Sequence, residues 1–535
     1  MCGIFAYIEQ KNEQKNKQKH EYSDILKYFI KTNHRGPDNC KLMTINKNKN
    51  KNKINLGFHR LMVNGLDFKS DQPFYIKKTY LVCNGEIYNY QQLIKEYNLD
   101  LDYETNSDCE IIIHLYKKIG FENMLKKLDG VFSFILYDEE LDDIFVARDP
   151  LGIRPLYICM SDNDIGFCSE AKSLLFMDNT NLKQFPPGCG WKMSNKHDFI
   201  KYYSFDYKIV SCDDEEMVCN KIRTLLTNGV NKRLMSDRTV GCLLSGGLDS
   251  TLVTALVSKN YKKGELKTYS IGLKGSVDLY WARIAATYLG TDHHEICVTE
   301  KEFLEAIPDT IKQIESYCTT TIRASVGNYL VSKYIKKNTP DVVIYCGDVS
   351  DEIFGSYRGF MNAPDDESFL KSNIDMLKNI CYFDVLRSDR SISGAGLESR
   401  VPFGDIDLVN YVMSLPVKYK MFGKDRMEKY YLRKAFEGYL PNDLLYRRKE
   451  AFSDGVSSPD RNWFDVIKEH VDKIIPNDID FNKKEFDGPQ PYDKESYWYR
   501  TIYNMYFGNI TLVPYYWRHP FCKQLDPSAR LLECY

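Results

Sequence analysis

The sequence predicts two domains of different fold class: a layered α+β domain, followed by an α/β domain with a doubly wound parallel sheet. Short apolar or alternating segments dominate residues 54–190, whereas helices and strands alternate from about residue 215. Proline-rich and acidic turns lie between these two regions, which favours two domains that pack separately. The expected boundaries are 2–200 for the first domain, 201–214 for a linker and 215–535 for the second domain.

Strands are expected to dominate the first domain. Turn signals such as Asn84-Gly85 and Asp149-Pro150 lie between four apolar or alternating segments: Ile54–Phe58, Tyr80–Cys83, Val131–Tyr137 and Ile144–Ala147. One further segment, Glu110–Lys118, has helical spacing. Two Lys/Asn-rich stretches, at 11–20 and 46–53, carry few apolar side chains, so we expect solvated loops there.

The second domain is expected to alternate helices with buried strands. The predicted helices are Glu215–Arg233, Thr251–Lys259 and Tyr280–Leu289. The predicted strands are Val240–Leu244, Leu266–Leu273, His294–Val298 and Val342–Cys346. Such alternation indicates parallel strands, with a ligand at their carboxyl ends. Helical patterns dominate beyond Asp351.

Composition excludes several classes of function. The 535 residues include 72 Lys and Arg against 74 Asp and Glu, a net charge of −2, which supplies no overall attraction to nucleic acid or an anionic membrane. No apolar run approaches the roughly 18 residues that span a bilayer, and Cys2–Ile8 lacks the basic flank of a secretory signal, so a cytoplasmic protein is expected. The 16 cysteines include no Cys-x-x-Cys pair, which argues against a transition-metal site.

The N-terminus carries a candidate nucleophile. Removal of Met1 would leave the Cys2 thiol beside a free α-amine, which titrates near about 8 and can accept the thiol proton. Asn84-Gly85-Glu86 offers a side-chain amide and a backbone N–H in a tight turn, the two donors that an acyl-transfer oxyanion requires. The Arg60 guanidinium suits a carboxylate, and the carboxylates of Glu86 and Asp108 suit an ammonium group.

These residues resemble those of the class II glutamine amidotransferases, whose glutaminase domain is a layered αββα fold with an N-terminal nucleophile. The matching segments follow the family's order: Met1–Ile4, His34–Asp38, His59–Leu61, Asn84–Asn89, Asp108 and Ala147–Leu156. The resemblance implies that Cys2 attacks the glutamine carboxamide, forming a thioester and releasing ammonia, while Asn84 and Gly85 stabilise the oxyanion. It implies glutamine binding by Arg60, Leu61, Met62, Val63, Asn64, Asn84, Gly85, Glu86 and Asp108, although the family usually has Asp in place of Asn64.

A second motif lies near the start of the second domain. Ser245-Gly246-Gly247-Leu248-Asp249-Ser250 follows a predicted strand and opens a helix, so its backbone N–H groups can approach an anion at the helix N-terminus. Asp249 can hold Mg²⁺ against phosphates. The loop lacks the Gly-Lys-Ser/Thr ending of a P-loop, which disfavours γ-phosphate transfer.

This motif is similar to the PP-loop signature of enzymes that cleave ATP between its α and β phosphates. With the first domain, it makes the chain similar to the glutamine-hydrolysing asparagine synthetases. Further matching segments are Tyr269–Leu273, Ser276–Leu279, Thr320–Ser325, Ser350–Gly355, Gly396–Phe403 and Lys449–Gly455. The resemblance implies that ATP activates aspartate as β-aspartyl-AMP, and that ammonia from the first domain passes through an internal tunnel and displaces AMP.

The same resemblance implies roles for single residues of the second domain. ATP is expected to contact Leu243, Ser245, Gly246, Gly247, Asp249, Ser250, Ile271, Cys346 and Gly347. Mg²⁺ is expected on Asp249 and Asp351, and pyrophosphate on Lys449. Aspartate and its adenylate are expected beside Thr320, Thr321 and Arg323. A homodimer is expected on the same basis.

The match departs from the family at the second site. Cys346–Glu352 reads CGDVSDE where the family usually has Ser-Gly-Glu-Gly-Ser-Asp-Glu, so Asp348, expected to act on the adenylate, is one methylene shorter. Val349 would be strained if its position needs a positive φ, and Cys318 replaces an Asp.

Two alternatives stay open. One is a relative that amidates another carboxylate or closes a β-lactam ring, although the ring-closing reaction needs no ammonia and the Cys2 site is intact. The other is a stand-alone glutaminase or binding module whose second half has lost its activity.

Overall fold

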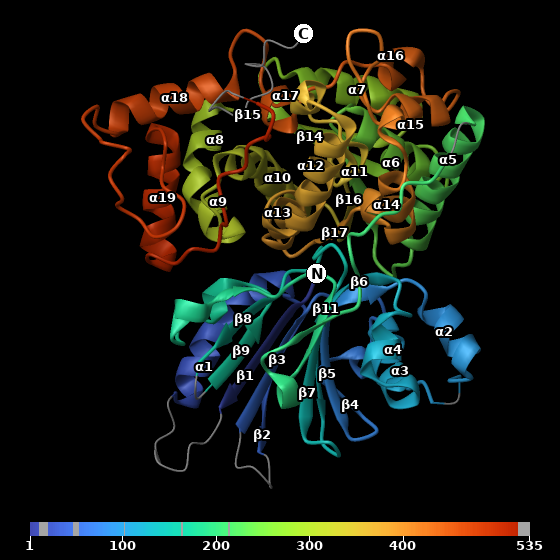
Figure 1. The fold of residues 1–535 in the computed structure, drawn as a ribbon, viewed down its shortest axis with the longest axis vertical. Helices are drawn as coiled ribbons and strands as arrows, with labels where there is room; N and C mark the ends of the chain where they lie inside the picture. The colour runs from blue at the N-terminus through green and yellow to red at the C-terminus, as the bar shows by residue number, and fades with distance from the viewer. Residues whose placement is uncertain (10–19, 47–52, 101, 162–163, 212–213, 523–535) are drawn as a thin grey trace. The chain divides into compact units, whose positions relative to one another are not determined.

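The computed structural model describes residues 1–9, 20–46, 53–100, 102–161, 164–211 and 214–522 (Figure 1). Most of both Lys/Asn-rich stretches, predicted as solvated loops, lies outside the described residues. The chain forms two compact units. The first unit contains Met1–Ser204, Met235–Arg238 and Ser393–Glu398, and the second contains Phe205–Leu234, Thr239–Ile392 and the chain from Ser399 onward. The first unit therefore includes two short segments from much later in the sequence.

Two six-stranded antiparallel sheets form the centre of the first unit. One has the strand order β10-β8-β9-β1-β3-β2, with bounds Lys183–Gln184, Tyr157–Met160, Asp164–Cys168, Gly3–Glu9, Lys53–Arg60 and Asn39–Asn46. The other has the order β12-β11-β7-β6-β5-β4, with bounds Phe199–Lys201, Cys189–Lys192, Asp143–Arg148, Gly130–Asp138, Thr79–Ile87 and Phe74–Ile76.

Alternation along the strands sorts the side chains of this unit into layers. Ile4, Ala6 and Ile8 of β1 join Val82 of β5 and Ile135 of β6 in the core between the sheets. Helices α2 (Tyr90–Tyr97), α3 (Ile111–Ile119) and α4 (Phe121–Leu125) cover the other face of the second sheet (Figure 1). Helix α1 (Tyr22–Phe29) packs on the first sheet, where Phe29 stacks on His59 of β3 with ring centroids 4.0 Å apart. The predicted αββα layering is confirmed.

The turn predicted at Asn84-Gly85 is wrong. Both residues lie inside β5, which pairs with β6 as far as Ile87 and places Gly85 opposite Phe132. Glycine is needed at position 85 because a Cβ there would lie 2.3 Å from the Val131 carbonyl oxygen. The amide and the N–H predicted as oxyanion donors therefore come from a strand of the sheet and not from a tight turn.

The second unit is built around a five-stranded sheet with the order β15-β14-β13-β16-β17, with bounds Asp292–Val298, Lys267–Leu273, Val240–Leu243, Val343–Tyr345 and Glu398–Arg400. Strand β13 is parallel to both of its neighbours, and β14 is parallel to β15. Helices α6 (Leu248–Ser258) and α7 (Val277–Leu289) connect β13, β14 and β15 in one direction, and α10 (Thr319–Asn338) returns the chain to β16. Strand order thus reverses between β13 and β16, the position where doubly wound sheets bind ligands.

The remaining helices surround this sheet: α5 (Glu215–Lys232), α8 (Glu300–Glu305), α9 (Ile307–Ile314), α11 (Ser350–Phe354), α12 (Asp366–Asn379), α13 (Asp384–Ser393), α14 (Ile406–Met413), α15 (Tyr430–Ala435), α16 (Asn442–Leu445), α17 (Phe452–Gly455), α18 (Trp463–Ile474) and α19 (Lys494–Phe507). The strands and helices predicted for this domain are confirmed with shifted ends. Helix α6 begins at Leu248, three residues earlier than predicted, because the extended Gly247 is its N-cap. In the part of the chain that the structure describes, no helix combines the length and the apolar character needed to cross a membrane.

Candidate functional site

Each unit contains a cavity that is lined by site residues predicted from the sequence. The cavity of the first unit measures about 30 Å³. Nine predicted residues line it: Cys2, Arg60, Leu61, Val63, Asn64, Asn84, Gly85, Glu86 and Asp108. Met62 does not line it, and the Met62 N–H instead donates to Asp38 Oδ2 at 2.8 Å.

The candidate nucleophile, Cys2, is half-buried and directly precedes strand β1. The Cys2 thiol donates to the Leu61 carbonyl oxygen at 3.6 Å, and Arg35 Nε donates to the Cys2 carbonyl oxygen at 2.9 Å. Burial raises the pKa of the Cys2 thiol to about 11, so the thiol is neutral near pH 7 and needs a base to become nucleophilic. Burial also lowers the pKa of the Met1 α-amine to about 6.

Asn84 faces the same cavity from strand β5. Its side chain is fully buried, yet among the described residues neither Oδ1 nor Nδ2 has a hydrogen-bond partner. A buried amide without partners costs roughly 1–3 kcal/mol, which a ligand in the cavity would recover. The unpartnered Nδ2 is therefore available to an oxygen of a bound molecule.

Carboxylates gather on another side of this cavity. Asn64 Nδ2 donates to Glu86 and lies 3.4 Å from Asp108 Oδ1, and the Ile87 N–H donates to Asp108 Oδ2 at 2.6 Å. Burial raises the pKa of Asp108 to about 6 despite these hydrogen bonds. An Asp at position 64 would add a third carboxylate, whereas the Asn64 amide bridges the two that are present.

Arg60 is fixed before any ligand arrives. Its guanidinium donates to the Asp71 carboxylate and to the backbone oxygens of Gly65 and Asp67, the last at 2.8 Å. A guanidinium held in this way is suited to a carboxylate because its side chain loses little further conformational freedom on binding.

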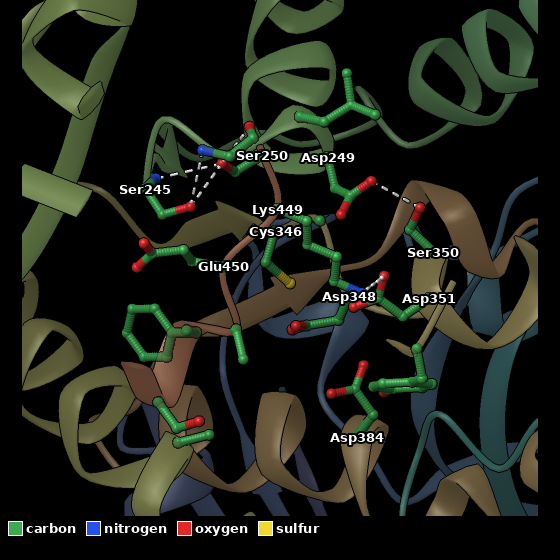
Figure 2. A pocket seen from close by; sticks show the side chains of 18 of the residues that line it. Ser245, Asp249, Ser250, Cys346, Asp348, Ser350, Asp351, Asp384, Lys449 and Glu450 are labelled. Carbon is green, nitrogen blue, oxygen red and sulfur yellow. Dashed lines mark hydrogen bonds and ion pairs between the residues drawn. The ribbon is translucent and has the colours of Figure 1, made fainter. Parts of the chain in front are cut away.

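The cavity of the second unit is larger, about 300 Å³, and lies at the carboxyl ends of β13 and β16 (Figure 2). The predicted residues that line it are Leu243, Ser245, Gly247, Asp249, Ser250, Ile271, Thr320, Thr321, Cys346, Gly347, Asp348, Asp351 and Lys449. Two predicted residues do not line it. Gly246 has φ 70° and packs against α7, where a Cβ would lie 2.3 Å from the Trp281 backbone. Arg323 is buried, with Nε 2.8 Å from Glu495 Oε1.

Backbone N–H groups and hydroxyls line the loop between β13 and α6. Ser250 Oγ lies 3.1 Å from Ser245 Oγ and accepts from the Ser245 N–H at 3.2 Å, while the Gly247 N–H donates to Ser245 Oγ at 3.3 Å. Figure 2 shows Ser245 and Ser250 facing each other across this loop. The loop thus presents small side chains at the N-terminus of an 11-residue helix, an arrangement suited to phosphate.

Opposite charges meet beside this loop. Lys429 Nζ lies 2.6 Å from Asp249 Oδ2 and 2.5 Å from Asp351 Oδ1, and Lys449 Nζ lies 2.6 Å from the same Asp351 oxygen. Ser350 Oγ also donates to Asp249 Oδ1 at 2.8 Å (Figure 2). Burial alone would raise the pKa of Asp351, but the two ammonium groups outweigh it and hold that pKa well below its usual range.

Asp249 and Asp351 fit a magnesium ion. Both are hard oxygen donors, and contact with one shared ammonium group shows that their oxygens approach closely enough for one cation. No cluster of three or more His, Cys, Asp or Glu side chains suited to a metal is found among the described residues. Two carboxylates with the remaining positions open to water and phosphate are the usual protein contribution to a magnesium–nucleotide site.

The departures from the family pattern have clear structural settings. Asp348 Oδ1 accepts from Arg387 Nη2 at 2.6 Å, so the shorter carboxylate is held by an arginine. Val349 has φ 79° and ψ −20°, the positive φ at which strain is predicted for a β-branched residue. Cys318 is buried and its sulfur accepts from the Trp517 N–H at 3.3 Å.

The sequence did not identify several residues of the two cavities. Glu398 lines the first cavity, and Lys429, Arg387 and Trp517 line the second. Glu398 belongs to a segment that matched the family, but the match gave it no role. Lys429 lies in the charged stretch KDRMEK, where nothing in the pattern distinguishes it from surface residues.

Comparison with known proteins agrees with this division. Residues 1–196 match the family described as "Glutamine amidotransferase domain", and residues 221–375 and 362–511 match "Asparagine synthase". Proteins named "Asparagine synthetase [glutamine-hydrolyzing]" are similar over nearly the full length. The Gallus gallus protein is 39% identical, with 95% of each chain covered, and the Mus musculus protein is 39% identical, with 100% of this chain and 99% of its own covered. The Homo sapiens protein is 38% identical with the same coverage as the mouse protein. The chain therefore belongs to the family of glutamine-hydrolysing asparagine synthetases.

Proposed function

We propose that this protein is a ligase that makes asparagine from aspartate, using ATP and the amide nitrogen of glutamine. The observation that carries the proposal is the pairing of two complementary cavities in one chain. One has a thiol beside a buried amide without partners, and the other has a phosphate-binding loop beside two carboxylates and two lysines.

Glutamine hydrolysis is assigned to the first cavity. After removal of Met1, the α-amine of Cys2 takes the thiol proton, and the thiolate attacks the glutamine carboxamide. Asn84 Nδ2 and the Gly85 N–H stabilise the resulting oxyanion, ammonia leaves, and water hydrolyses the thioester to glutamate. Arg60 and the backbone of residues 61–64 hold the glutamine α-carboxylate, while Glu86 and Asp108 hold its α-ammonium group.

Activation of aspartate is assigned to the second cavity. A carboxylate is a poor electrophile and has to be activated before ammonia can attack it. An oxygen of the aspartate β-carboxylate attacks the α-phosphorus of ATP, which forms β-aspartyl-AMP and releases pyrophosphate. Ammonia then attacks the acyl carbon, and asparagine and AMP are the products. Lys449 stabilises the charge on the leaving pyrophosphate, and residues 245–250 hold its oxygens by their N–H groups and hydroxyls.

Side chains around the loop complete this assignment. Leu243, Ile271, Cys346 and Gly347 contact the adenosine, and Thr320 and Thr321 contact the aspartate. Arg323 is left out of the substrate contacts because its guanidinium pairs with Glu495, so we assign it to positioning helix α10. Asp348, held by Arg387, is assigned to the proton transfers that accompany attack on the adenylate.

A magnesium ion, a homodimer and a cytoplasmic location are part of the proposal and rest on the family. When bound at Asp249 and Asp351, Mg²⁺ would neutralise phosphate charge. The oligomeric state is tested by light scattering of the purified chain, and the location by fractionation of cells that express it.

The decisive experiment measures all products in one reaction. Purified protein is given ATP, Mg²⁺, aspartate and glutamine, and asparagine, glutamate, AMP and pyrophosphate are quantified. Equal amounts of asparagine, AMP and pyrophosphate are expected, with ammonium chloride able to replace glutamine. Formation of ADP would contradict adenylation, and glutamate without AMP would favour the stand-alone glutaminase. Replacement of aspartate by other dicarboxylates tests the remaining alternative substrate class.

A further inference from the structure

Lys429 occupies the position between the two carboxylates that were predicted to hold a metal ion. Its Nζ contacts Asp249 Oδ2 at 2.6 Å and Asp351 Oδ1 at 2.5 Å. The side chain is only 2% exposed, so the ammonium group is enclosed and not a surface charge that happens to lie nearby. It is the N-cap of α15 and has a positive φ of 56°.

The other lysine of the site is arranged differently. Lys449 Nζ contacts Asp351 but not Asp249, and its second acceptor is the Ser356 carbonyl oxygen at 3.2 Å. Its side chain is 17% exposed. Lys429 is therefore the ammonium group that joins the two carboxylates, whereas Lys449 contacts one of them from the more open side.

The two carboxylates would repel each other in an enclosed cavity if no cation lay between them. Like charges repel strongly at the low effective dielectric constant of a protein interior, so a cation between them is favoured. A divalent cation on the same oxygens satisfies the same requirement, and an ammonium group and a metal ion cannot both contact them at full strength.

From this geometry, we propose that Lys429 is a positioning residue of the synthetase site that holds Asp249 and Asp351 together in the absence of nucleotide. It yields these oxygens to the divalent cation that accompanies ATP and then pairs with phosphate. This inference rests on the proposed function for the identity of the nucleotide, but its central step concerns competition between an ammonium group and a metal ion for two named oxygens.

The step can be measured without turnover. Binding of Mn²⁺ to the full chain, in the absence of any nucleotide, is followed by loss of the electron paramagnetic resonance signal of the free ion. Lys429→Met is expected to bind Mn²⁺ about tenfold more tightly than the unaltered chain, because the competing charge is gone and both carboxylates remain. Lys429→Arg, which keeps the charge, is expected to bind it as weakly as the unaltered chain.

Two further variants separate this effect from a general change in charge. Lys449→Met is expected to raise Mn²⁺ affinity less than Lys429→Met, since Lys429 still joins the carboxylates. Lys434→Met removes a lysine of helix α15 that pairs with Glu215 at the surface, 2.8 Å away, and is expected to change nothing. Equal Mn²⁺ affinity in the unaltered chain and Lys429→Met, or an equal rise in Lys449→Met, would overturn the proposal.

Folding of each variant is checked by circular dichroism and thermal unfolding. If Lys429→Met does not fold, Lys429→Gln is used, which keeps two N–H donors but no charge and has the same expected rise in affinity. Failure of both to fold would show that the ion pairs serve the fold alone and would also overturn the proposal. Mn²⁺ binding requires no product assay, so a negative result here leaves asparagine synthesis standing, and a failed product assay leaves this result standing.

Discussion

The two cavities differ in how much of their chemistry is in place before a ligand arrives. In the first, the thiol, the Asn84 amide and the Arg60 fork are fixed by an antiparallel sheet and by backbone hydrogen bonds. In the second, the charged groups satisfy one another, with Lys429 and Lys449 on Asp249 and Asp351. Under the proposed function, the first cavity is thus ready for the glutamine amide, whereas the second exchanges internal ion pairs for a nucleotide and its cation.

Backbone conformation follows the same division. No non-glycine residue of the first cavity's lining has a positive φ, whereas Val349 and Lys429, both in the lining of the second, have φ values of 79° and 56°. Such conformations cost roughly 1–3 kcal/mol and persist only where the surrounding structure holds them. The cavity that is proposed to bind the nucleotide is therefore also the one in which backbone strain is expected.

The largest expected effect separates the two cavities completely. Cys2→Ala removes the nucleophile, so glutamine-dependent synthesis is expected to fall by more than about 10³-fold, while synthesis from ammonium chloride stays within a few-fold. Asparagine formation from each nitrogen source measures this. Cys40→Ala, at an exposed thiol of strand β2, is the matched control and should retain both activities. Loss of both activities in Cys2→Ala would contradict separate sites.

A variant of the second cavity is expected to lose asparagine synthesis and to retain glutamine hydrolysis. Lys449→Met leaves the developing pyrophosphate charge without its ammonium group, so synthesis from either nitrogen source is expected to fall by about 10²- to 10³-fold. Glutamine hydrolysis, measured as glutamate release without ATP, is expected to persist. Lys434→Met serves as the surface control. A matching fall in glutamate release would show that the cavities do not work independently.

A smaller effect concerns the carboxylates that are assigned to the glutamine ammonium group. Burial raises the pKa of Asp108 to about 6, and its proposed pairing with the glutamine ammonium group requires its charged form. As the pH falls below about 6, binding must expel a proton, so the Kd for glutamine is expected to rise about tenfold per pH unit. Calorimetry in the Cys2→Ala background, where glutamine is not consumed, measures this dependence between pH 5 and 7.5.

The Asp108→Asn change in the same background supplies the control. It keeps an oxygen that accepts from the Ile87 N–H but cannot titrate, so glutamine binding is expected to be about tenfold weaker at pH 7.5 and independent of pH below 6. A pH dependence that survives in Asp108→Asn would assign the titration to another group, such as Glu86.

Most of the first cavity could be predicted because its residues lie in short motifs that keep their order along the chain. Even so, the sequence predicts a turn at Asn84-Gly85, since this dipeptide favours tight turns between strands. Pairing of β5 with β6 overrides that local preference, and the close Val131 carbonyl oxygen explains the glycine instead. Segment Ser393–Glu398 also belongs to the first unit, and such a return of the chain leaves no signal in the sequence around it.

The second cavity was predicted less completely for a related reason. Its loop 245–250 has a local signature, whereas Lys429 reaches Asp249 across 180 positions and has no pattern around it. Arg323 lies one helical turn from Thr320 in the matching segment, yet it points to Glu495, because burial of an arginine requires a partner. Sequence motifs identify functional residues that are contiguous in the chain. Ion pairs between distant segments can be identified only from the folded structure.

The smallest expected effect tests whether strain belongs to the second site. Val349→Gly removes an unfavourable φ of 79° but also removes buried methyl groups, and Val349→Ala removes nearly as many methyl groups while keeping the strain. A protein with glycine inside a helix or strand is ordinarily less stable than one with alanine there, by up to about 1 kcal/mol. Here we expect the order to reverse, with Val349→Gly more stable than Val349→Ala by about 1 kcal/mol, as measured by thermal unfolding. If Val349→Ala is the more stable variant, the positive φ costs little, and the contrast in backbone strain between the two cavities is lost.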